Sequence, residues 1–177
     1  MKKNILKGIL ALVLAVSCIG TLAACTMGTV KAPEIPEGYQ AYDNGAISFA
    51  YPADWTANSG SVATLVNPTG TGNNITVVYE AKTDMYDDLT AESFGEMMRP
   101  TYEAMGMTIS DVKVEKKTTN GLTVVEITYN AKVAGTPLSQ TAFITTVGNS
   151  TYTVTVTEMT EDDELVRTVF KTLYASK

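Results

Sequence analysis

The chain has 177 residues, with 13 Lys and Arg, 19 Asp and Glu, two Cys and no His, which gives a formal net charge of −6. The absence of His excludes Ser-His-Asp and Cys-His catalysis, His-ligated zinc or haem, and an imidazole pH switch. No segment concentrates Lys and Arg, and a phosphate backbone would repel so acidic a chain, so we expect no nucleic-acid partner. The length favours a single domain.

The N-terminal segment carries the features of a secretory signal. Lysines precede an apolar run from Ile9 to Ile19, and Leu22-Ala23-Ala24-Cys25 follows that run. This tetrapeptide resembles the lipobox of bacterial lipoproteins, in which the cysteine thiol carries a diacylglycerol. We therefore expect a cleaved signal peptide over residues 1–24 and lipidation of Cys25. The alternative is an uncleaved membrane-spanning helix over Gly8 to Val30, because this stretch has no charged residue.

Residues 25–42 are expected to form a lipidated, flexible tether, since they mix Thr, Gly and Pro with few large apolar side chains. The folded domain is expected over residues 43–177. Cleavage before Cys25 would remove three Lys and no acid, so the charge balance becomes 10 minus 19, or −9. Once Cys25 is acylated no thiol remains, and we expect no disulfide in the domain.

Alternating apolar and polar residues between turn formers predict a series of strands. Asn67–Asn74 consists almost wholly of turn-forming residues and predicts a hairpin between the second and third strands. The remaining strands form a meander whose first turn, Asn120-Gly121, is typical of a type I′ hairpin. The predicted strands are Ala46–Tyr51, Val62–Val66, Ile75–Tyr79, Ile109–Lys117, Thr123–Val133, Leu138–Val147 and Thr151–Glu158.

Two helices are predicted. The first covers Thr90–Gly106, and Pro100 should bend or restart it near Met97, because proline cannot donate to the preceding turn. The second covers Thr160–Tyr174, with an N-terminal cap at Thr160 and acidic residues in its first turn, where the helix dipole favours them. The residues expected to face the core are Phe94, Met98, Tyr102 and Met105 in the first helix, and Leu165, Val166, Val169, Phe170, Leu173 and Tyr174 in the second.

This order of elements indicates an α+β fold, an antiparallel sheet of six to seven strands with a mid-chain helix and a C-terminal helix packed on it. The segment Gly45–Trp55, in which an aromatic strand runs into Tyr51-Pro52 and then Trp55, resembles the start of PsbP/DcrB-like domains. The order of elements over residues 42–177 is similar as well. The resemblance implies an α/β/α sandwich of the PsbP type. It also implies a binding or assembly role, since members of this superfamily are mostly not enzymes.

An acidic loop is one candidate site. Asp84, Asp87 and Asp88, with Glu92 nearby, offer the oxygen ligands that Ca²⁺ prefers. Their spacing lacks the alternating acids and the central Gly of an EF-hand, so a solvated charged loop is the other interpretation.

Methionine and aromatic side chains are further candidates. Trp55, Tyr51 and Tyr42 are interpreted as core anchors at a strand end, with a recognition groove as the alternative. A second group could form a soft copper(I) site or fill the core, namely Met85, Met97, Met98, Met105 and Met107.

No catalytic, cofactor-binding or metal-binding residue is assigned, and Cys25 is the only site residue, as the point of lipid attachment. The sequence predicts a non-enzymatic lipoprotein on the extracytoplasmic face of the cell membrane of a monoderm bacterium, where it binds an unidentified envelope protein. An accessory lipoprotein that binds calcium or a small ligand at Asp84 to Asp88 is the alternative. Glycoside chemistry by paired carboxylates is a third reading, but no sequence pattern identifies the pair.

The lipobox gives a direct prediction. Cys25→Ala removes the thiol that accepts the lipid, so the precursor should accumulate with residues 1–24 attached. Immunoblotting of membrane fractions measures the size of the product. Normal processing of the variant would show that Cys25 is not the lipidation site.

Overall fold

The computed structural model describes residues 31–58, 62–160 and 162–176. The expected signal peptide, the lipidation site Cys25 and the first part of the tether lie outside these described residues. Lys31–Lys177 form one compact unit. Within the described ranges, neither helix is long and apolar enough to span a membrane.

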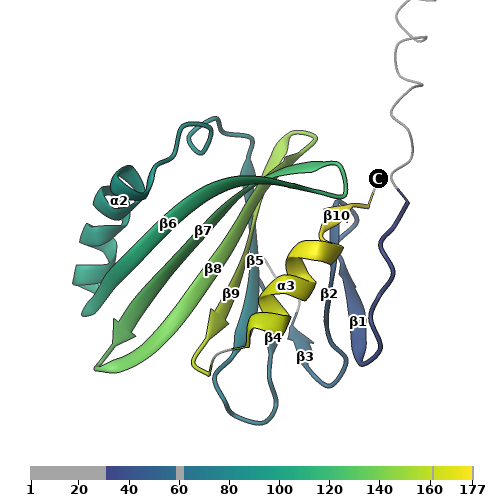
Figure 1. Cartoon of the computed structure of the whole chain (residues 1–177), viewed down its shortest axis with the longest axis horizontal. Coiled ribbons are helices and arrows are strands. Elements are labelled where there is room, and N and C mark those ends of the chain that lie inside the picture. The colour runs from purple at the N-terminus through teal and green to yellow at the C-terminus, as the bar shows by residue number, and fades with distance from the viewer. Residues whose placement is uncertain (1–30, 59–61, 161, 177) are drawn as a thin grey trace, which may run out of the picture. The chain divides into compact units, whose positions relative to one another are not determined.

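The described chain folds into two antiparallel sheets and two helices (Figure 1). A three-stranded sheet has the order β1-β2-β10, and a seven-stranded sheet has the order β3-β4-β5-β9-β8-β7-β6. The strands are β1 (Tyr39–Asp43), β2 (Ile47–Pro52), β3 (Thr56–Asn58), β4 (Ala63–Val66), β5 (Asn74–Ala81), β6 (Met107–Thr119), β7 (Leu122–Val133), β8 (Thr136–Val147), β9 (Ser150–Glu158) and β10 (Tyr174–Ala175), and the helices are α2 (Ala91–Ala104) and α3 (Asp163–Thr172).

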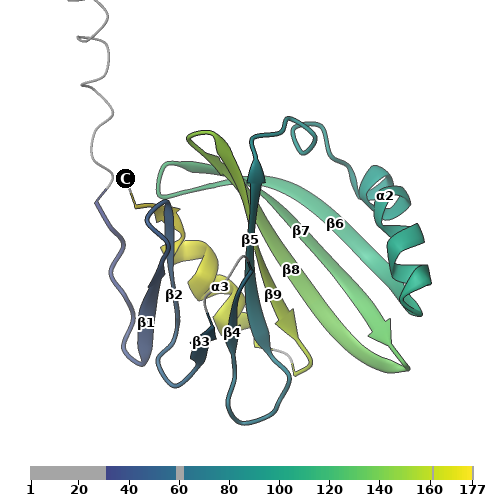
Figure 2. The ribbon, with the colours of Figure 1, turned by 180° about the vertical axis from the view of Figure 1, so that it is seen from behind.

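The seven-stranded sheet carries buried apolar residues on both faces, so it packs two cores. On one face, α3 and the three-stranded sheet cover residues of β4, β5, β8 and β9, including Leu65, Phe143 and Val154. On the opposite face, α2 packs Phe94 and Tyr102 against β7 and β8. The two views in Figures 1 and 2 show the helices on opposite sides of the sheet. The expected α+β sandwich is therefore confirmed.

The predicted turns and the first helix form largely as expected. Asn120 and Gly121 have φ angles of 45° and 79°, as a type I′ turn requires. Thr90 caps α2, because its hydroxyl accepts from the Ser93 backbone N–H at 3.1 Å, and Ser93 bonds back to Thr90. Pro100 does not restart the helix, which continues to Ala104. A bend near Met97 stays a prediction.

Several sequence predictions are wrong in detail. Met105 is not on the buried face of α2, because it follows the last turn and is 57% exposed. Asp162, not Thr160, caps α3, since its carboxylate accepts from the Leu165 backbone N–H at 3.1 Å. Tyr174 lies in β10 rather than in the helix, where it pairs with β2. Residues 39–42, which the sequence places in the tether, instead belong to β1. Each residue of β1 has a backbone partner in β2.

Strand β2 is held between elements from the two ends of the domain. It pairs with β1 on one side and with the short β10 on the other. Beyond β10, the Ala50 backbone N–H donates to the Thr172 hydroxyl at 2.8 Å, and that hydroxyl donates to the Thr168 carbonyl at 2.6 Å. Because Ala50 and Thr172 are both buried, one α3 side chain replaces the strand partner that β10 is too short to provide.

We therefore expect Thr172→Val to destabilise the domain while keeping its shape. The substitution leaves the buried Ala50 N–H without an acceptor, which costs about 1–3 kcal/mol. Urea unfolding of the full chain measures the loss. Thr172→Ser retains the hydroxyl and is the matched control, and an equal loss in both variants would contradict this role of the hydrogen bond.

Candidate functional site

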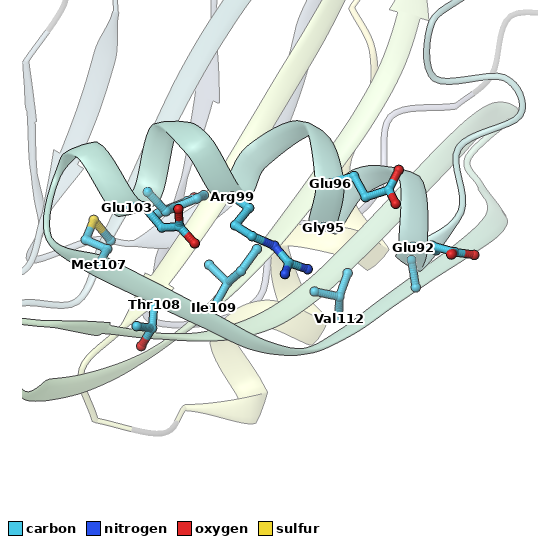
Figure 3. A pocket seen from close by; sticks show the side chains of 11 residues that line it. Glu92, Gly95, Glu96, Arg99, Glu103, Met107, Thr108, Ile109 and Val112 are labelled. Atoms are coloured by element: carbon cyan, nitrogen blue, oxygen red, sulfur yellow. The ribbon is translucent and has the colours of Figure 1, made fainter.

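A groove of about 440 Å³ lies between α2 and the edge strand β6 (Figure 3). Helix α2 forms its upper wall and the start of β6 forms its floor. We call this feature the α2–β6 groove. Its lining residues are Ala91, Glu92, Gly95, Glu96, Arg99, Tyr102 and Glu103 from α2, and Met107, Thr108, Ile109 and Val112 from the strand side.

The spacing of charged residues on α2 places them along this groove. Glu92, Glu96, Arg99 and Glu103 follow one another at intervals of four, three and four residues, which is the repeat of one helical face. Gly95 lies among them, and a Cβ atom added there would meet no atom within 4 Å. The missing side chain leaves the middle of the groove open.

The groove combines an apolar floor with an acidic rim. Ile109 and Val112 are partly buried beneath Arg99, whose side chain extends over them in Figure 3. Three glutamates against one arginine give the rim a net charge of −2. In the part of the chain that the structure describes, the salt bridges join Lys117 to Glu115 and Glu126, and none involves the groove. The charges along the groove are thus available to a partner.

Tyr102 fixes the groove wall to the sheet through a buried chain of hydrogen bonds. Its hydroxyl shares a 2.6 Å hydrogen bond with the Tyr129 hydroxyl, which donates to the Gln140 amide oxygen at 2.6 Å. The Gln140 amide nitrogen then donates to the Thr157 hydroxyl at 2.8 Å. Burial, followed by the hydrogen bond from Tyr102, raises the pKa of Tyr129 above its usual value of 10.

The strand that forms the floor of the groove is also the free edge of the seven-stranded sheet. Strand β6 pairs with β7 only, so alternate backbone N–H and C=O groups of β6 point away from the sheet. The register shifts between Ser110 and Lys113, and Asp111 adopts a φ of 56°. This bulge limits a regular strand edge along the groove to Met107–Ser110.

A second, more polar hollow of about 820 Å³ lies partly on the opposite face of β6, β7 and β8. Asp111 accepts hydrogen bonds there from Ser110 at 2.9 Å and Asn130 at 3.0 Å. These hydrogen bonds, that of Asn130 first, lower the pKa of Asp111. Because Ser110, Asp111 and Asn130 bond to one another, these polar groups of the second hollow are less available to a partner than the charged side chains of the α2–β6 groove.

The acidic loop does not assemble into a site. Asp84, Asp87 and Asp88 are exposed, and the loop is closed by a backbone hydrogen bond from Asp87 to Asp84 at 3.0 Å. Among the described residues, no group of three His, Cys, Asp or Glu side chains could hold a metal ion. Glu92, the fourth acid of that candidate, lines the α2–β6 groove instead.

The aromatic and methionine candidates separate into core and surface. Trp55 and Tyr51 are buried in the larger core, and Tyr42 stacks on Phe49, so all three anchor the strand end and do not line a groove. The methionines are dispersed. Met98 and Met107 pack against the smaller core, whereas exposed positions are taken by Met85, Met97 and Met105.

The groove itself is the feature that the sequence analysis missed. Its helical wall could have been found from the spacing of Glu92, Glu96, Arg99 and Glu103. The floor could not, because nothing in the sequence places Ile109 and Val112 next to that face of the helix.

Comparison with known proteins identifies the class to which this fold belongs. The sequence profile of the PsbP family matches residues 37–176. The chain therefore belongs to the PsbP family. No curated protein matches the chain in sequence.

The fold is shared with a solved structure. The chain is similar to the cyanobacterial PsbP protein CyanoP from Synechocystis sp. PCC 6803, with 18% identity, coverage of 84% of this chain and 98% of that one, and a TM-score of 0.61. More distant is LpqN of Mycobacterium tuberculosis, described as involved in cell envelope biogenesis, with 12% identity, coverage of 78% and 91%, and a TM-score of 0.45. A Bacteroides thetaiotaomicron protein shows 19% identity, coverage of 74% and 45%, and a TM-score of 0.47.

The buried tyrosine chain predicts how stability depends on pH. Because the folded-state pKa of Tyr129 is raised, its contribution is fully present below pH about 10, the unfolded-state value, and is lost as the pH rises towards the folded-state value. The melting temperature of the full chain should fall above pH about 10.

Tyr129→Phe should make that fall shallower without abolishing it, because other tyrosines also have raised pKa values, among them Tyr86, whose pKa burial and Glu80 raise to about 12. Thermal unfolding followed by circular dichroism between neutral and strongly alkaline pH measures the slope. An unchanged slope in Tyr129→Phe would contradict the assignment.

Proposed function

We propose that this PsbP-family chain is a non-enzymatic binding module that holds a basic, extended segment of an envelope protein in the α2–β6 groove. The observation that carries the proposal is the groove itself, an apolar floor with an exposed acidic rim beside a free strand edge. The proposed activity needs neither a cofactor nor a metal.

The chemistry of the groove supports a basic segment. Lysine or arginine side chains of a partner could pair with Glu92, Glu96 and Glu103, while its apolar side chains cover Ile109 and Val112. An extended backbone could also pair with the free edge of β6 over Met107–Ser110. Because the bulge shortens that edge, side-chain contacts must provide most of the affinity and the specificity.

A lipid anchor at Cys25 would be compatible with binding of a membrane-associated partner in the α2–β6 groove. A lipid on Cys25, with residues 26–38 as the remaining tether, would keep the domain at the extracytoplasmic face of the cell membrane. Confinement to the membrane raises the effective concentration of the domain around its neighbours, so a small groove with modest affinity suffices. The support for this part is the lipobox resemblance in the sequence.

Gly95→Leu is the sharpest test of the groove. Since a Cβ at Gly95 meets nothing within 4 Å, a larger side chain has room to begin there and extend into the groove. Replacing a helical glycine should stabilise α2 by about 0.5–1 kcal/mol while the partner is excluded. Crosslinking and pull-down of the full chain from cell membranes, with mass spectrometry, should recover a partner with the wild type and lose it with Gly95→Leu.

Charge reversal provides the matched pair of variants. Glu96→Lys alters the acidic rim and should reduce recovery of the partner about tenfold or more. Glu37→Lys makes the same change at an exposed position outside the groove and should have no effect. Equal recovery with wild type, Gly95→Leu and Glu96→Lys would show that the groove is not the binding site.

A further inference from the structure

The α2–β6 groove has the length of a short extended peptide. Its helical lining, Ala91–Glu103, covers about 18 Å of helix. Its strand lining, Met107–Val112, covers about 17 Å of strand. The two elements run alongside each other in Figure 3, so the groove follows both of them. An extended segment of about five or six residues matches this length.

The charges along the groove are unevenly distributed. The part of the rim nearer the start of α2 carries Glu92 and Glu96 and no basic residue. The part nearer the end of the helix carries Arg99 and Glu103, whose charges balance. All four side chains are exposed. We call Arg99 and Glu103 the neutral half of the groove. The opposite half is acidic.

The loop before α2 extends this acidic half. Asp87 and Asp88 are exposed, and Asp88 lies two residues before the helix cap Thr90, so its Cα is within about 8 Å of that cap. On either side of the two aspartates, Tyr86 and Leu89 pack against the smaller core. These contacts hold the loop beside the start of the groove. The acidic half is therefore made of Asp87, Asp88, Glu92 and Glu96.

Strand β6 contributes one basic residue to the same side of the sheet. The register pairs Lys116 with Val125, whose side chain lies in the core beneath α2. In the described part of the chain, however, the salt bridges are those of Lys117 with Glu115 and Glu126, so Lys116 pairs with none of the four acids. The acidic half keeps a negative charge even when Lys116 is counted with it.

We propose that the α2–β6 groove binds its basic segment in one orientation, with two basic residues at the acidic half and uncharged residues at the neutral half. This inference rests on the proposed function and specifies the chemistry of the partner. A lysine placed at the neutral half gains no net attraction, because Arg99 offsets Glu103. The segment is therefore short, extended, basic at one end and uncharged at the other.

The spacing of the rim glutamates sets the spacing of the two basic residues. Glu92 and Glu96 are separated by four residues of helix, which is about 6 Å along the helix axis. Alternate residues of an extended chain point to the same side and lie about 6.8 Å apart. Two basic residues with one residue between them therefore match Glu92 and Glu96, and a pair that is adjacent in sequence does not.

Binding of labelled peptides to the full chain, measured by fluorescence anisotropy, tests the inference. Three peptides of about eight residues have the same composition and capped termini, so that two lysines carry their only charges. The lysines stand at alternate positions at the amino end, at alternate positions at the carboxyl end, or one at each end. We expect one of the first two peptides to bind about fivefold or more tighter than the third. The preferred peptide also gives the direction of the bound segment.

Substitutions at exposed positions then test the two halves of the groove. Arg99→Gln removes the charge that offsets Glu103, so the peptide with separated lysines should bind more tightly and the preference should shrink. Asp87→Asn combined with Asp88→Asn should weaken binding of the preferred peptide about threefold or more. Glu37→Gln combined with Asp54→Asn removes the same charge at exposed positions outside the groove lining and is the matched control.

The outcomes separate this inference from the proposed function. Equal affinities for the three peptides, each lost with Gly95→Leu, would overturn the single orientation and leave the groove as the binding site. An unchanged preference in Arg99→Gln, or equal effects of the loop variant and its control, would also contradict the inference. Absence of binding by all three peptides would overturn it as well, and the pull-down from cell membranes then decides on the proposed function alone.

Discussion

The central constraint on this structure is a seven-stranded sheet with apolar residues on both faces, which therefore needs cover on both sides. One face is covered by α3 together with the three-stranded sheet, and the other by the single helix α2. One helix is too narrow for seven strands. The incomplete cover on the α2 side leaves the groove beside β6 at one margin. The α2–β6 groove is a consequence of this mismatch.

On the α2 side, a chain of hydrogen bonds leads from the covered strands to the uncovered ones. Beneath α2, the hydroxyls of Tyr102 and Tyr129 meet and lead through Gln140 to Thr157 at the boundary of the uncovered strands. Every buried side-chain polar atom among the described residues has a hydrogen-bond partner. The core beneath α2 therefore ends at Thr157 without an unsatisfied buried side-chain polar atom.

Much of the fold could be predicted from the sequence, because strands such as β7 and β9 alternate clearly and Asn120-Gly121 specifies its turn locally. The elements that were missed are β1, β3 and β10. These are short or polar strands, which leave little periodicity in the sequence. In addition, β10 pairs with a strand that is distant in the sequence, as Tyr174 and Ser48 illustrate. The groove was predictable only in part, since helical spacing aligns Glu92 with Glu96 and Arg99 but does not reveal which strand lies beneath them. The prediction that Cys25 carries a lipid rests on the sequence pattern alone, because Cys25 lies outside the described residues.

The closure of β2 by the last residues of the domain has a consequence for the order of folding. Ser176 donates its backbone N–H to the Ala46 carbonyl, and Thr172 supplies the acceptor for Ala50, so the first strands complete their hydrogen bonds only with the last segment of the chain. Contacts over such a separation form slowly, because a long loop must be closed first. A chain that is still on the ribosome lacks this last segment, so β2 cannot complete its hydrogen bonds until the C-terminal residues have arrived.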